Sequence, residues 1–266
     1  MKVGILFKQN SKKAVQLAEK VKAFLKKRFC PYIILNGKKR IKGLDLILVL
    51  GGDGTLLYTA SLVGEKGVPI LGVNLGGLGF LTEIKEEELF LELEKFFSGK
   101  LKIENRMLLS VRIGKNQRYL ALNDLMVGKT ELGKMVEIEL KVDGYELTRF
   151  RADGIIVSTP TGSTAYCLAA GGPIVHPNLS CIILTPICAH SLSLKPLVIP
   201  ANSKILIKAR SKKGEVYLYV DGRKGKRLAS GDELHISSAQ APLKLVGSPS
   251  MNYYEILRAK LGWGLK

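Results

Sequence analysis

The hydrophobic pattern of this chain changes at about residue 101, and that change is the strongest constraint on its fold. Before it, short apolar runs alternate with amphipathic segments, which is the pattern of a parallel sheet covered by helices. The apolar runs are Val3 to Phe7, Tyr32 to Leu35, Asp45 to Leu50 and Val68 to Val73. Helices are expected from Ser11 to Phe29 and from Glu86 to Phe97. We therefore predict a doubly wound α/β domain over residues 1–100.

Short β-like segments separated by turn signals follow from Leu101 onward. Asp143-Gly144 and Asp221-Gly222 lie between such segments as hairpin-turn dipeptides. This pattern predicts a β-rich, sandwich-like domain over residues 101–250. The pattern turns helical again from Tyr253 to Leu261, so we expect residues 251–266 to pack back on the first domain.

The composition indicates a soluble globular protein. The 266 residues are 46% hydrophobic, which is enough for a sizeable core. No run approaches the ~18 apolar residues of a membrane helix, and the apolar stretch in MKVGILFKQN is too short for a signal peptide. The four cysteines show no CxxC spacing and the three histidines no HExxH motif, so neither structural zinc nor disulfides are expected. We expect a cytoplasmic protein.

The formal net charge of +18 predicts attraction to polyanions. The densest clusters are Lys26 to Arg28 and Lys38 to Lys42. Few aromatic residues that could stack on bases lie between these basic residues, and no base-reading motif is recognisable. Both observations disfavour a nucleic-acid partner. The charge suits a phosphate-rich small substrate, although scattered lysines also serve as a solvated surface.

A glycine-rich turn follows the buried run LILVL: Gly51, Gly52, Asp53, Gly54 and Thr55, after which a helix is expected. Ligands bind at the carboxyl ends of strands in such sheets, and glycines let phosphate oxygens approach the backbone near the helix N-terminus. Asp53 could then act as a proton acceptor or as a magnesium contact. A turn without any ligand is the alternative interpretation.

A second glycine cluster, Gly72 to Phe80, follows the next strand and includes Asn74. Two such loops on neighbouring strands could face one crevice. Their spacing does not match GxGxxG, so a redox dinucleotide fold is disfavoured. Gly128-Lys129-Thr130 is not a P-loop, because Asn123 stands where the first glycine would be.

Polar residues interrupt the apolar pattern at two places in the second half. Asn123-Asp124 could clamp ribose hydroxyls or an adenine edge, or could form an exposed bend. The segment from Arg151 to Pro177 combines hydroxyl groups with small residues. Its side chains could contact sugar and phosphate or leave room for a planar ring, or the segment could be only a loop: Thr161, Ser163, Thr164, Ala165, Tyr166 and Ala169. Ser163 lacks a GxSxG setting, which disfavours a hydrolase.

Taken together, four segments resemble the NAD kinase family: GGDGT at Gly51 to Thr55, NLGGLGFL at Asn74 to Leu81, LND at Leu122 to Asp124, and DGIIVSTPTGSTAY at Asp153 to Tyr166. HSLSLKPLV and the closing LRAKLGW fit as well, so the resemblance covers nearly the whole chain. It implies a Rossmann-like N-terminal domain, a β-rich C-terminal domain and a homodimer or homotetramer. It implies phosphorylation of the 2′-hydroxyl of the adenosine ribose of NAD, with ATP or polyphosphate as donor and a divalent metal, magnesium.

The resemblance also implies roles for individual residues. Asp53 corresponds to the catalytic carboxylate, with Gly54 beside it, and Asn123 and Asp124 to the pair that holds the adenosine part of NAD. Arg151 lies where the family tunes NAD against NADH. Further ligand-contacting positions are Asp153, Thr164 to Ala169, Lys134, Cys188, Asp221 and Arg223. Tyr58, Ala169 and Arg223 replace residues that are common in the family, which leaves donor preference open.

Two other functions compete with this interpretation. Lipid kinases share GGDGT, although no exposed amphipathic stretch indicates a membrane surface. A non-enzymatic basic module that binds nucleotides or nucleic acid is the second alternative.

Overall fold

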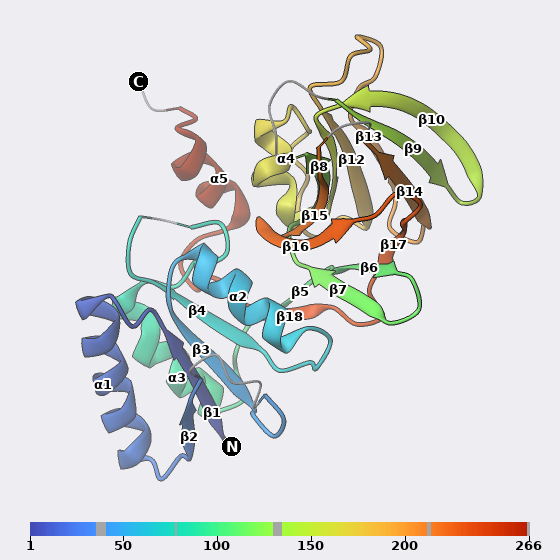
Figure 1. The fold of residues 1–266 in the computed structure, drawn as a ribbon. Helices are drawn as coiled ribbons and strands as arrows, with labels where there is room; N and C mark the ends of the chain where they lie inside the picture. The colour runs from blue at the N-terminus through green and yellow to red at the C-terminus, as the bar shows by residue number, and fades with distance from the viewer. Residues whose placement is uncertain (36–40, 78, 130–134, 212–213, 265–266) are drawn as a thin grey trace. The chain divides into compact units, whose positions relative to one another are not determined.

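The structure is a computed structural model that describes residues 1–35, 41–77, 79–129, 135–211 and 214–264. It divides into two compact units (Figure 1). The first comprises Met1–Asn105 and Leu243–Lys266, and the second comprises Arg106–Pro242. No helix among the described residues is both long and apolar enough to span a membrane.

The first unit is built on a six-stranded sheet with the order β2-β1-β3-β4-β18-β5. The strands are β1 (Val3–Phe7), β2 (Tyr32–Ile34), β3 (Leu46–Gly51), β4 (Ile70–Asn74), β5 (Ile103–Arg106) and β18 (Leu243–Val246). β1 pairs in parallel with both β2 and β3, and β4 pairs in parallel with β3 and β18. Every residue of β3 is buried, as its continuous apolar run requires in a sheet covered on both faces.

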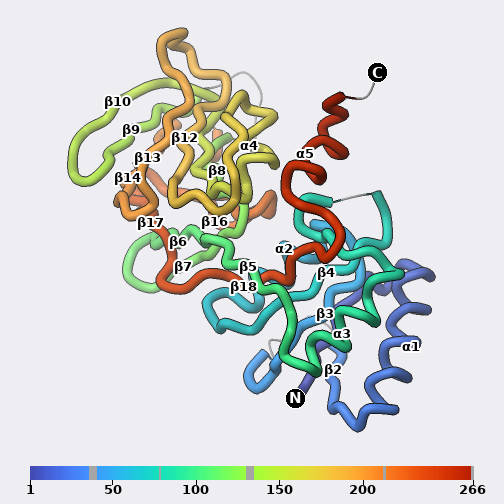
Figure 2. Tube along the Cα trace, turned by 180° about the vertical axis from the view of Figure 1, so that it is seen from behind, coloured from blue at the N-terminus to red at the C-terminus, as the bar shows by residue number. Residues whose placement is uncertain are grey.

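Helices cover both faces of this sheet (Figures 1 and 2). α1 (Lys12–Lys27) and α3 (Leu89–Phe97) lie side by side and share one apolar core with Leu46, Leu48 and Leu50 of β3. α2 (Asp53–Val63) packs on the opposite face, and α5 (Tyr253–Leu261) ends the unit. The helices expected from Ser11 to Phe29 and from Glu86 to Phe97 are both shorter than predicted. The Ser11 hydroxyl caps α1, which ends before Phe29, a residue with a positive φ of 53°. Glu86–Glu88 form a 3-10 turn before α3.

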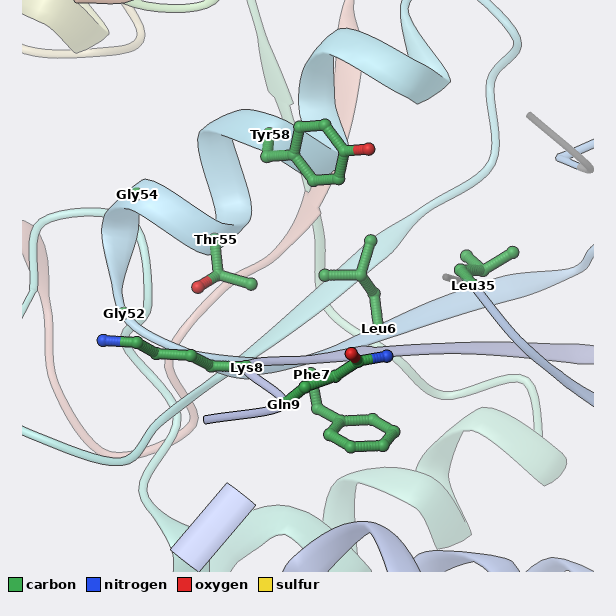
Figure 3. A pocket seen from close by; sticks show the side chains of 9 residues that line it. All are labelled: Leu6, Phe7, Lys8, Gln9, Leu35, Gly52, Gly54, Thr55 and Tyr58. Atoms are coloured by element: carbon green, nitrogen blue, oxygen red, sulfur yellow. The ribbon is translucent and has the colours of Figure 1, made fainter. Parts of the chain in front are cut away.

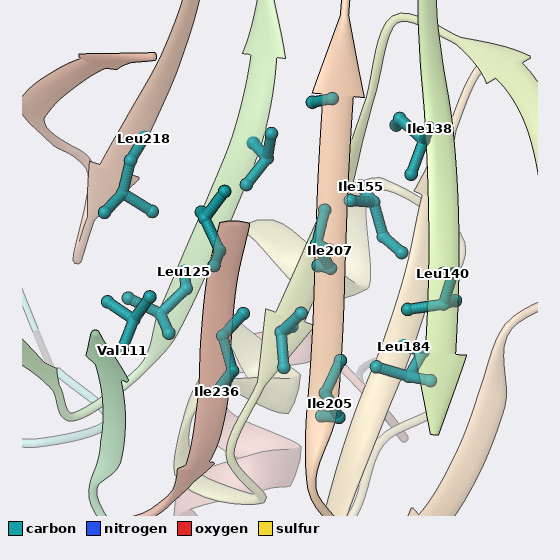
Figure 4. Close-up of a cluster of buried hydrophobic side chains, with 14 of the residues drawn as sticks. Val111, Leu125, Ile138, Leu140, Ile155, Leu184, Ile205, Ile207, Leu218 and Ile236 are labelled. Carbon is teal, nitrogen blue, oxygen red and sulfur yellow. The ribbon is translucent and has the colours of Figure 1, made fainter. Parts of the chain in front are cut away.

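The second unit is a sandwich of two antiparallel sheets. Their orders are β10-β9-β14-β17-β6-β7 and β13-β12-β11-β8-β15-β16. The inner faces of both sheets supply one apolar core, to which Val111, Ile207 and Ile236 contribute from the first sheet and Leu125, Ile155 and Leu218 from the second (Figure 4). Alternating burial along strands such as β9 and β14 turns one face of each toward this core, whereas every residue of β11 is buried.

The strands of the sandwich are β6 (Leu109–Ile113), β7 (Gln117–Ala121), β8 (Asp124–Lys129), β9 (Val136–Val142), β10 (Tyr145–Ala152), β11 (Gly154–Ser158), β12 (Cys181–Ile187), β13 (Leu197–Pro200), β14 (Ile205–Arg210), β15 (Val216–Val220), β16 (Arg223–Leu228) and β17 (Glu233–Ser238). Between β11 and β12 the chain forms a 3-10 turn, η2 (Thr161–Thr164), and a short helix, α4 (Tyr166–Ala169).

The structure confirms the predicted fold class, an α/β unit followed by a β-rich unit, but it places the division elsewhere. Residues 101–250 were expected to form one domain. Instead, β5 and β18 complete the first sheet, so that the chain returns to the first unit at Leu243, before α5. The apolar alternation of LKLV does not reveal which sheet the strand joins, because that choice depends on long-range pairing.

Candidate functional site

A pocket of about 730 Å³ lies in the first unit at the carboxyl ends of β1 and β3 (Figure 3). β2 and β3 flank β1 on opposite sides, so the winding of the sheet reverses between β1 and β3. Open α/β sheets bind ligands at such a reversal. The lining residues are Leu6, Phe7, Lys8, Gln9, Leu35, Gly52, Gly54, Thr55 and Tyr58.

The glycine-rich turn forms one wall of this pocket. Gly52 is the N-cap of α2 and supplies no capping side chain, so the positive end of the helix dipole faces the pocket wall. Gly51 packs closely, since an added Cβ would lie 2.7 Å from the Thr55 hydroxyl oxygen. Lys8, at the end of β1, adds a cationic side chain to the lining. Helix dipole, lysine and hydroxyl together suit a phosphate chain.

Asp53 turns its carboxylate toward the segment Gly79–Thr82 of the second glycine loop. Oδ2 accepts the Phe80 N–H at 2.9 Å. Oδ1 accepts the Leu81 N–H at 3.2 Å, the Thr82 N–H at 3.0 Å and the Thr82 hydroxyl at 2.9 Å. The two glycine-rich loops predicted on neighbouring strands are thus joined through this one carboxylate.

Asn74 and Phe80 shape the same loop. The Asn74 amide donates to the Gly77 carbonyl at 2.9 Å and accepts the Gly76 N–H at 2.8 Å. The Phe80 ring lies under the Lys260 ammonium of α5, 5.6 Å from ring centroid to nitrogen. Both side chains were expected to contact a ligand, and here their contacts are within the first unit.

A second group of predicted residues meets in the β sandwich, where Asp221 binds the corner that begins β8. Asp221 Oδ1 accepts the Asn123 N–H at 2.7 Å and the Asp124 N–H at 3.2 Å, and Oδ2 accepts the Leu122 N–H at 3.0 Å. The Asp221 N–H donates back to the Asp124 carbonyl at 3.0 Å. One carboxylate therefore fixes the backbone of the whole LND motif.

The side chains of this corner are buried and only partly satisfied. Asn123 Oδ1 and Thr161 Oγ1 are buried without a hydrogen-bond partner among the described residues. Burial, and then the charge of Asp221, raise the pKa of Asp124 to about 7. Gly162 follows Thr161 and packs against the same corner, because an added Cβ would lie 2.1 Å from the Asn123 carbonyl oxygen. Buried polar groups without partners are typical of ligand sites whose ligand supplies the missing bonds.

The hydroxyl-rich segment divides into structural and open side chains. Ser163 is structural, because its hydroxyl accepts the Val175 N–H at 3.0 Å and lies 2.7 Å from the Pro160 carbonyl. Thr164 is only partly buried, and Tyr166 exposes 46% of its surface. Ala165 is the N-cap of the short helix α4, and Ala169 is its last residue. The tyrosine ring and the small residues are therefore open to a ligand.

The remaining candidates lie near the ends of β10, β11 and β12 and at the start of β16. The Asp153 carboxylate pairs with the Lys129 ammonium at 2.7 Å, and the Asp153 N–H donates to the Ile187 carbonyl. Arg151 and Arg223 are exposed, and Cys188 is an exposed residue with a positive φ of 46°. Lys134 and most of the Lys38 to Lys42 cluster lie outside the described residues.

Sequence reasoning did not identify three residues that shape these sites: Lys8, Lys129 and Thr82. In the sequence, Lys8 is only a polar residue after an apolar strand, and Lys129 belongs to the motif that was rejected as a P-loop. Thr82 follows the predicted glycine-rich run Gly72 to Phe80, and no pattern there shows which atoms reach Asp53. The one sequence feature that could have identified Thr82 is the position of that run directly after a neighbouring parallel strand.

Comparisons with known proteins match these two groups of residues. Residues 37–101 match the ATP-NAD kinase N-terminal domain, and residues 122–248 match the ATP-NAD kinase C-terminal domain. The NAD kinase of Geobacter sulfurreducens is 48% identical over 83% of this chain and 79% of its own length. The NAD kinase of Syntrophotalea carbinolica is 41% identical over 99% of both chains.

Solved structures agree with the sequence relatives. The yeast NADH kinase, solved in complex with NADH, has a TM-score of 0.91 at 26% identity, covering 100% of this chain and 88% of that chain. An NAD kinase from Archaeoglobus fulgidus, solved in complex with ATP, has a TM-score of 0.83 at 29% identity over 97% of this chain and 99% of that one. Neither the lipid-kinase nor the nucleic-acid alternative gains support from these matches. The chain therefore belongs to the NAD kinase family of phosphotransferases, which phosphorylate NAD.

Proposed function

We propose that Asp53 accepts the proton of the 2′-hydroxyl of the adenosine ribose of NAD as that oxygen attacks the terminal phosphorus of the donor. The O–H bond breaks, a new O–P bond forms, and the bond from that phosphorus to the rest of the donor breaks. The observation that carries the proposal is the Asp53 carboxylate, which hydrogen bonds from Phe80 and Thr82 hold in place. In the chain Asp53 stands between two pocket-lining glycines, Gly52 and Gly54. A rigid acceptor beside a phosphate cradle is the arrangement that phosphoryl transfer needs.

The pocket of the first unit is the proposed donor site. Its volume of about 730 Å³ lies in the range of nucleotide-sized pockets. The α2 N-terminus and Lys8 provide positive potential for phosphates. ATP is the proposed donor, in line with the ATP complex of the Archaeoglobus fulgidus enzyme. Polyphosphate would use the same phosphate contacts without filling the remaining volume.

A magnesium ion fits this site as a companion of the donor. Among the described residues no group of three His, Cys, Asp or Glu side chains could hold a metal ion. Magnesium commonly takes most of its ligands from substrate phosphates and water. The Thr55 hydroxyl, which lines the pocket, would hold it, and the ion would neutralise charge that develops on the donor phosphates.

The corner of the second unit is the proposed NAD-binding region. Asn123, Asp124 and Thr161 present buried polar atoms that ribose hydroxyls and the adenine edge could satisfy. Thr164, Ala165, Tyr166 and Ala169 offer a hydroxyl and an open aromatic ring beside small residues. Arg151, Asp153, Cys188 and Arg223 are proposed as further contacts. Asp221 is proposed to act through the corner that it fixes, since its carboxylate oxygens already accept three backbone amides.

We also propose a cytoplasmic homodimer or homotetramer. All four cysteines are free thiols, which suits a reducing compartment. The edge strand β13 exposes Leu197 and Val198, and Leu192 before it is 89% exposed. Exposed apolar side chains beside an unpaired strand edge are typical of contact surfaces between subunits.

The test is NADP formation from NAD and magnesium, with ATP or polyphosphate as donor, for the wild type and Asp53→Asn. The asparagine keeps the size of the side chain but cannot act as a base, so we expect turnover to fall at least about a thousandfold. Circular dichroism and a thermal melt establish that the variant is folded. A folded Asp53→Asn variant with wild-type turnover would disprove the role of Asp53. Loss of activity in EDTA and its return with magnesium test the metal.

A further inference from the structure

The two carboxylate oxygens of Asp53 are not equivalent. Oδ1 accepts three hydrogen bonds, from the Leu81 N–H, the Thr82 N–H and the Thr82 hydroxyl. Oδ2 accepts one, from the Phe80 N–H. A carboxylate oxygen offers two lone-pair directions. The donors from the loop therefore fill Oδ1, and a lone pair remains available only on Oδ2.

The loop segment Gly79–Thr82 is built to close on this carboxylate. Thr82 is completely buried, and its hydroxyl donates to Asp53 Oδ1 at 2.9 Å. Gly79 permits the close approach, because a Cβ at that position would lie 2.1 Å from Asp53 Oδ1 and 2.6 Å from the Thr82 hydroxyl oxygen. The backbone amides alone would hold the carboxylate at the same edge, and the hydroxyl adds a contact that fixes its rotation.

We infer that Thr82 is a positioning residue for phosphoryl transfer, whose hydroxyl locks Oδ1 so that Oδ2 is the oxygen that takes the proton from the ribose hydroxyl. This inference rests on the proposed role of Asp53 as the base. The proton moves from the ribose oxygen to Oδ2, and the electron pair of the broken O–H bond forms the bond to the transferred phosphorus. The donor's remaining phosphates leave with the electron pair of the broken P–O bond.

Loss of the Thr82 hydroxyl should affect the chemical step and not the binding of either substrate. The χ2 angle of an aspartate side chain lies in a broad well, so its orientation depends on the hydrogen bonds that hold it. Without the Thr82 hydroxyl, the carboxylate spends less time in the productive orientation. Thr82 is neither among the residues that line the proposed donor pocket nor among the proposed NAD contacts of the second unit. Turnover should therefore fall while the KM values for both substrates stay the same.

The experiment measures kcat and KM for NAD and ATP in Thr82→Val, Thr82→Ala and Thr82→Ser. Valine has nearly the shape of threonine and replaces the hydroxyl by a methyl group, alanine removes both groups, and serine keeps the hydroxyl without the methyl group. We expect kcat to fall about tenfold or more in the valine and alanine variants, as expected for a lost hydrogen bond to a charged group. We expect serine to recover most of the rate. Each KM should stay within about twofold of the wild-type value.

The matched control is Thr59→Val. Thr59 is also completely buried, and its hydroxyl donates to a backbone carbonyl within α2, that of Thr55, at 2.9 Å. This variant makes the same chemical change without touching Asp53, so its kcat should equal that of the wild type. Thermal melts of all variants measure any general loss of stability.

Three results would overturn the inference: a kcat of folded Thr82→Val or Thr82→Ala within twofold of the wild type, a rise in KM with unchanged kcat, or a serine variant as slow as the valine variant. Failure of the underlying function gives a different result, because Asp53→Asn would then remain active whatever the Thr82 variants do. An inactive Asp53→Asn beside a fully active Thr82→Val would leave the base in place and remove only the role of Thr82.

Discussion

At the scale of single residues, Asp124 is a buried acid whose charged form is disfavoured in the second unit. Its burial removes the solvent that would stabilise a carboxylate, and the nearby Asp221 adds a like charge. The backbone amides of the corner donate to Asp221 instead. A pKa of about 7 for Asp124 means that the group changes its charge within the physiological range.

This perturbation predicts how the stability of the ligand-free protein depends on pH. Because the folded pKa of about 7 lies above the ordinary value of 3.8, the folded state binds the proton more tightly than the unfolded state does. The contribution is fully present below about pH 4 and is lost as the pH rises through about 7. The difference between the folded and the ordinary pKa corresponds to a change of up to about 4 kcal/mol in the free energy of unfolding. Asp124→Asn should remove most of this slope in urea unfolding at several pH values between 5 and 8.

Asp232→Asn is the control for that experiment. Hydrogen bonds from the Ala229 N–H and from Lys226 lower the pKa of Asp232, so its contribution has the opposite sign and is lost only as the pH falls through the acid range. Its variant should change stability by a constant amount between pH 5 and 8. If the free energies of unfolding of the wild type and Asp124→Asn depend on pH in the same way, the pKa of Asp124 is not raised and the prediction is wrong.

At the scale of elements, two similar hairpin turns bind different parts of the second unit. Asp143 and Asp221 each precede a glycine, each has a positive φ, 52° and 48°, and each turn connects an antiparallel hairpin. The Asp143 carboxylate accepts the Lys204 N–H at 2.7 Å, whereas the Asp221 carboxylate accepts three amides of the LND corner. The turn chemistry is the same, and the partner differs.

We expect Asp221→Ala to raise the KM for NAD at least fivefold and to destabilise the protein by about 2–3 kcal/mol, because three buried amides lose a charged acceptor. Asp143→Ala should cost about 1 kcal/mol and leave KM unchanged, since its single bond lies in another hairpin. Steady-state kinetics and urea unfolding of both variants measure these values. Equal effects of the two variants on KM would show that Asp221 only stabilises its turn.

The same pair shows how far the sequence predicts the fold and the site. Both hairpin turns, the strands around them and the α5 helix follow from local patterns, because Asp-Gly dipeptides and apolar periodicity act over a few residues. The contact of Asp221 with the corner joins residues 97 to 99 positions apart. No local pattern encodes such a contact. β18 was assigned to the wrong unit for the same reason, since strand partners are chosen by long-range pairing.

The candidate ligand residues also divide into those that local sequence patterns predict and those that they do not. The glycines and Asp53 could be predicted as a phosphate site because their position after a buried strand carries its own physical meaning. The resemblance to a known family supplied Asp153 and Cys188, whose surroundings carry no such signal. Thr82 escaped both approaches, because its importance lies in one hydroxyl contact across 29 positions.

At the scale of the whole molecule, the net charge of +18 is the property that acts on every encounter with a substrate. ATP carries more negative charge than NAD, so a basic protein attracts the donor more strongly than the acceptor. Salt weakens this attraction, because the screening length falls from about 10 Å at 0.1 M ionic strength to about 3 Å at 1 M. Once both substrates are bound, the chemical step occurs at short range and is screened much less.

We therefore expect kcat/KM for ATP to fall several-fold between about 0.05 and 0.5 M potassium chloride, and kcat/KM for NAD to fall less. The value of kcat should change little. Measuring both substrates in the same protein makes NAD the internal control, since any general effect of salt on folding or on the chemical step would lower both values equally. If the two kcat/KM values fall in parallel, the basic surface serves solubility and does not recruit the donor. If only the ATP value falls, the charge of the whole molecule contributes to donor capture, and Lys8 in the pocket is the first position at which to divide local from long-range attraction.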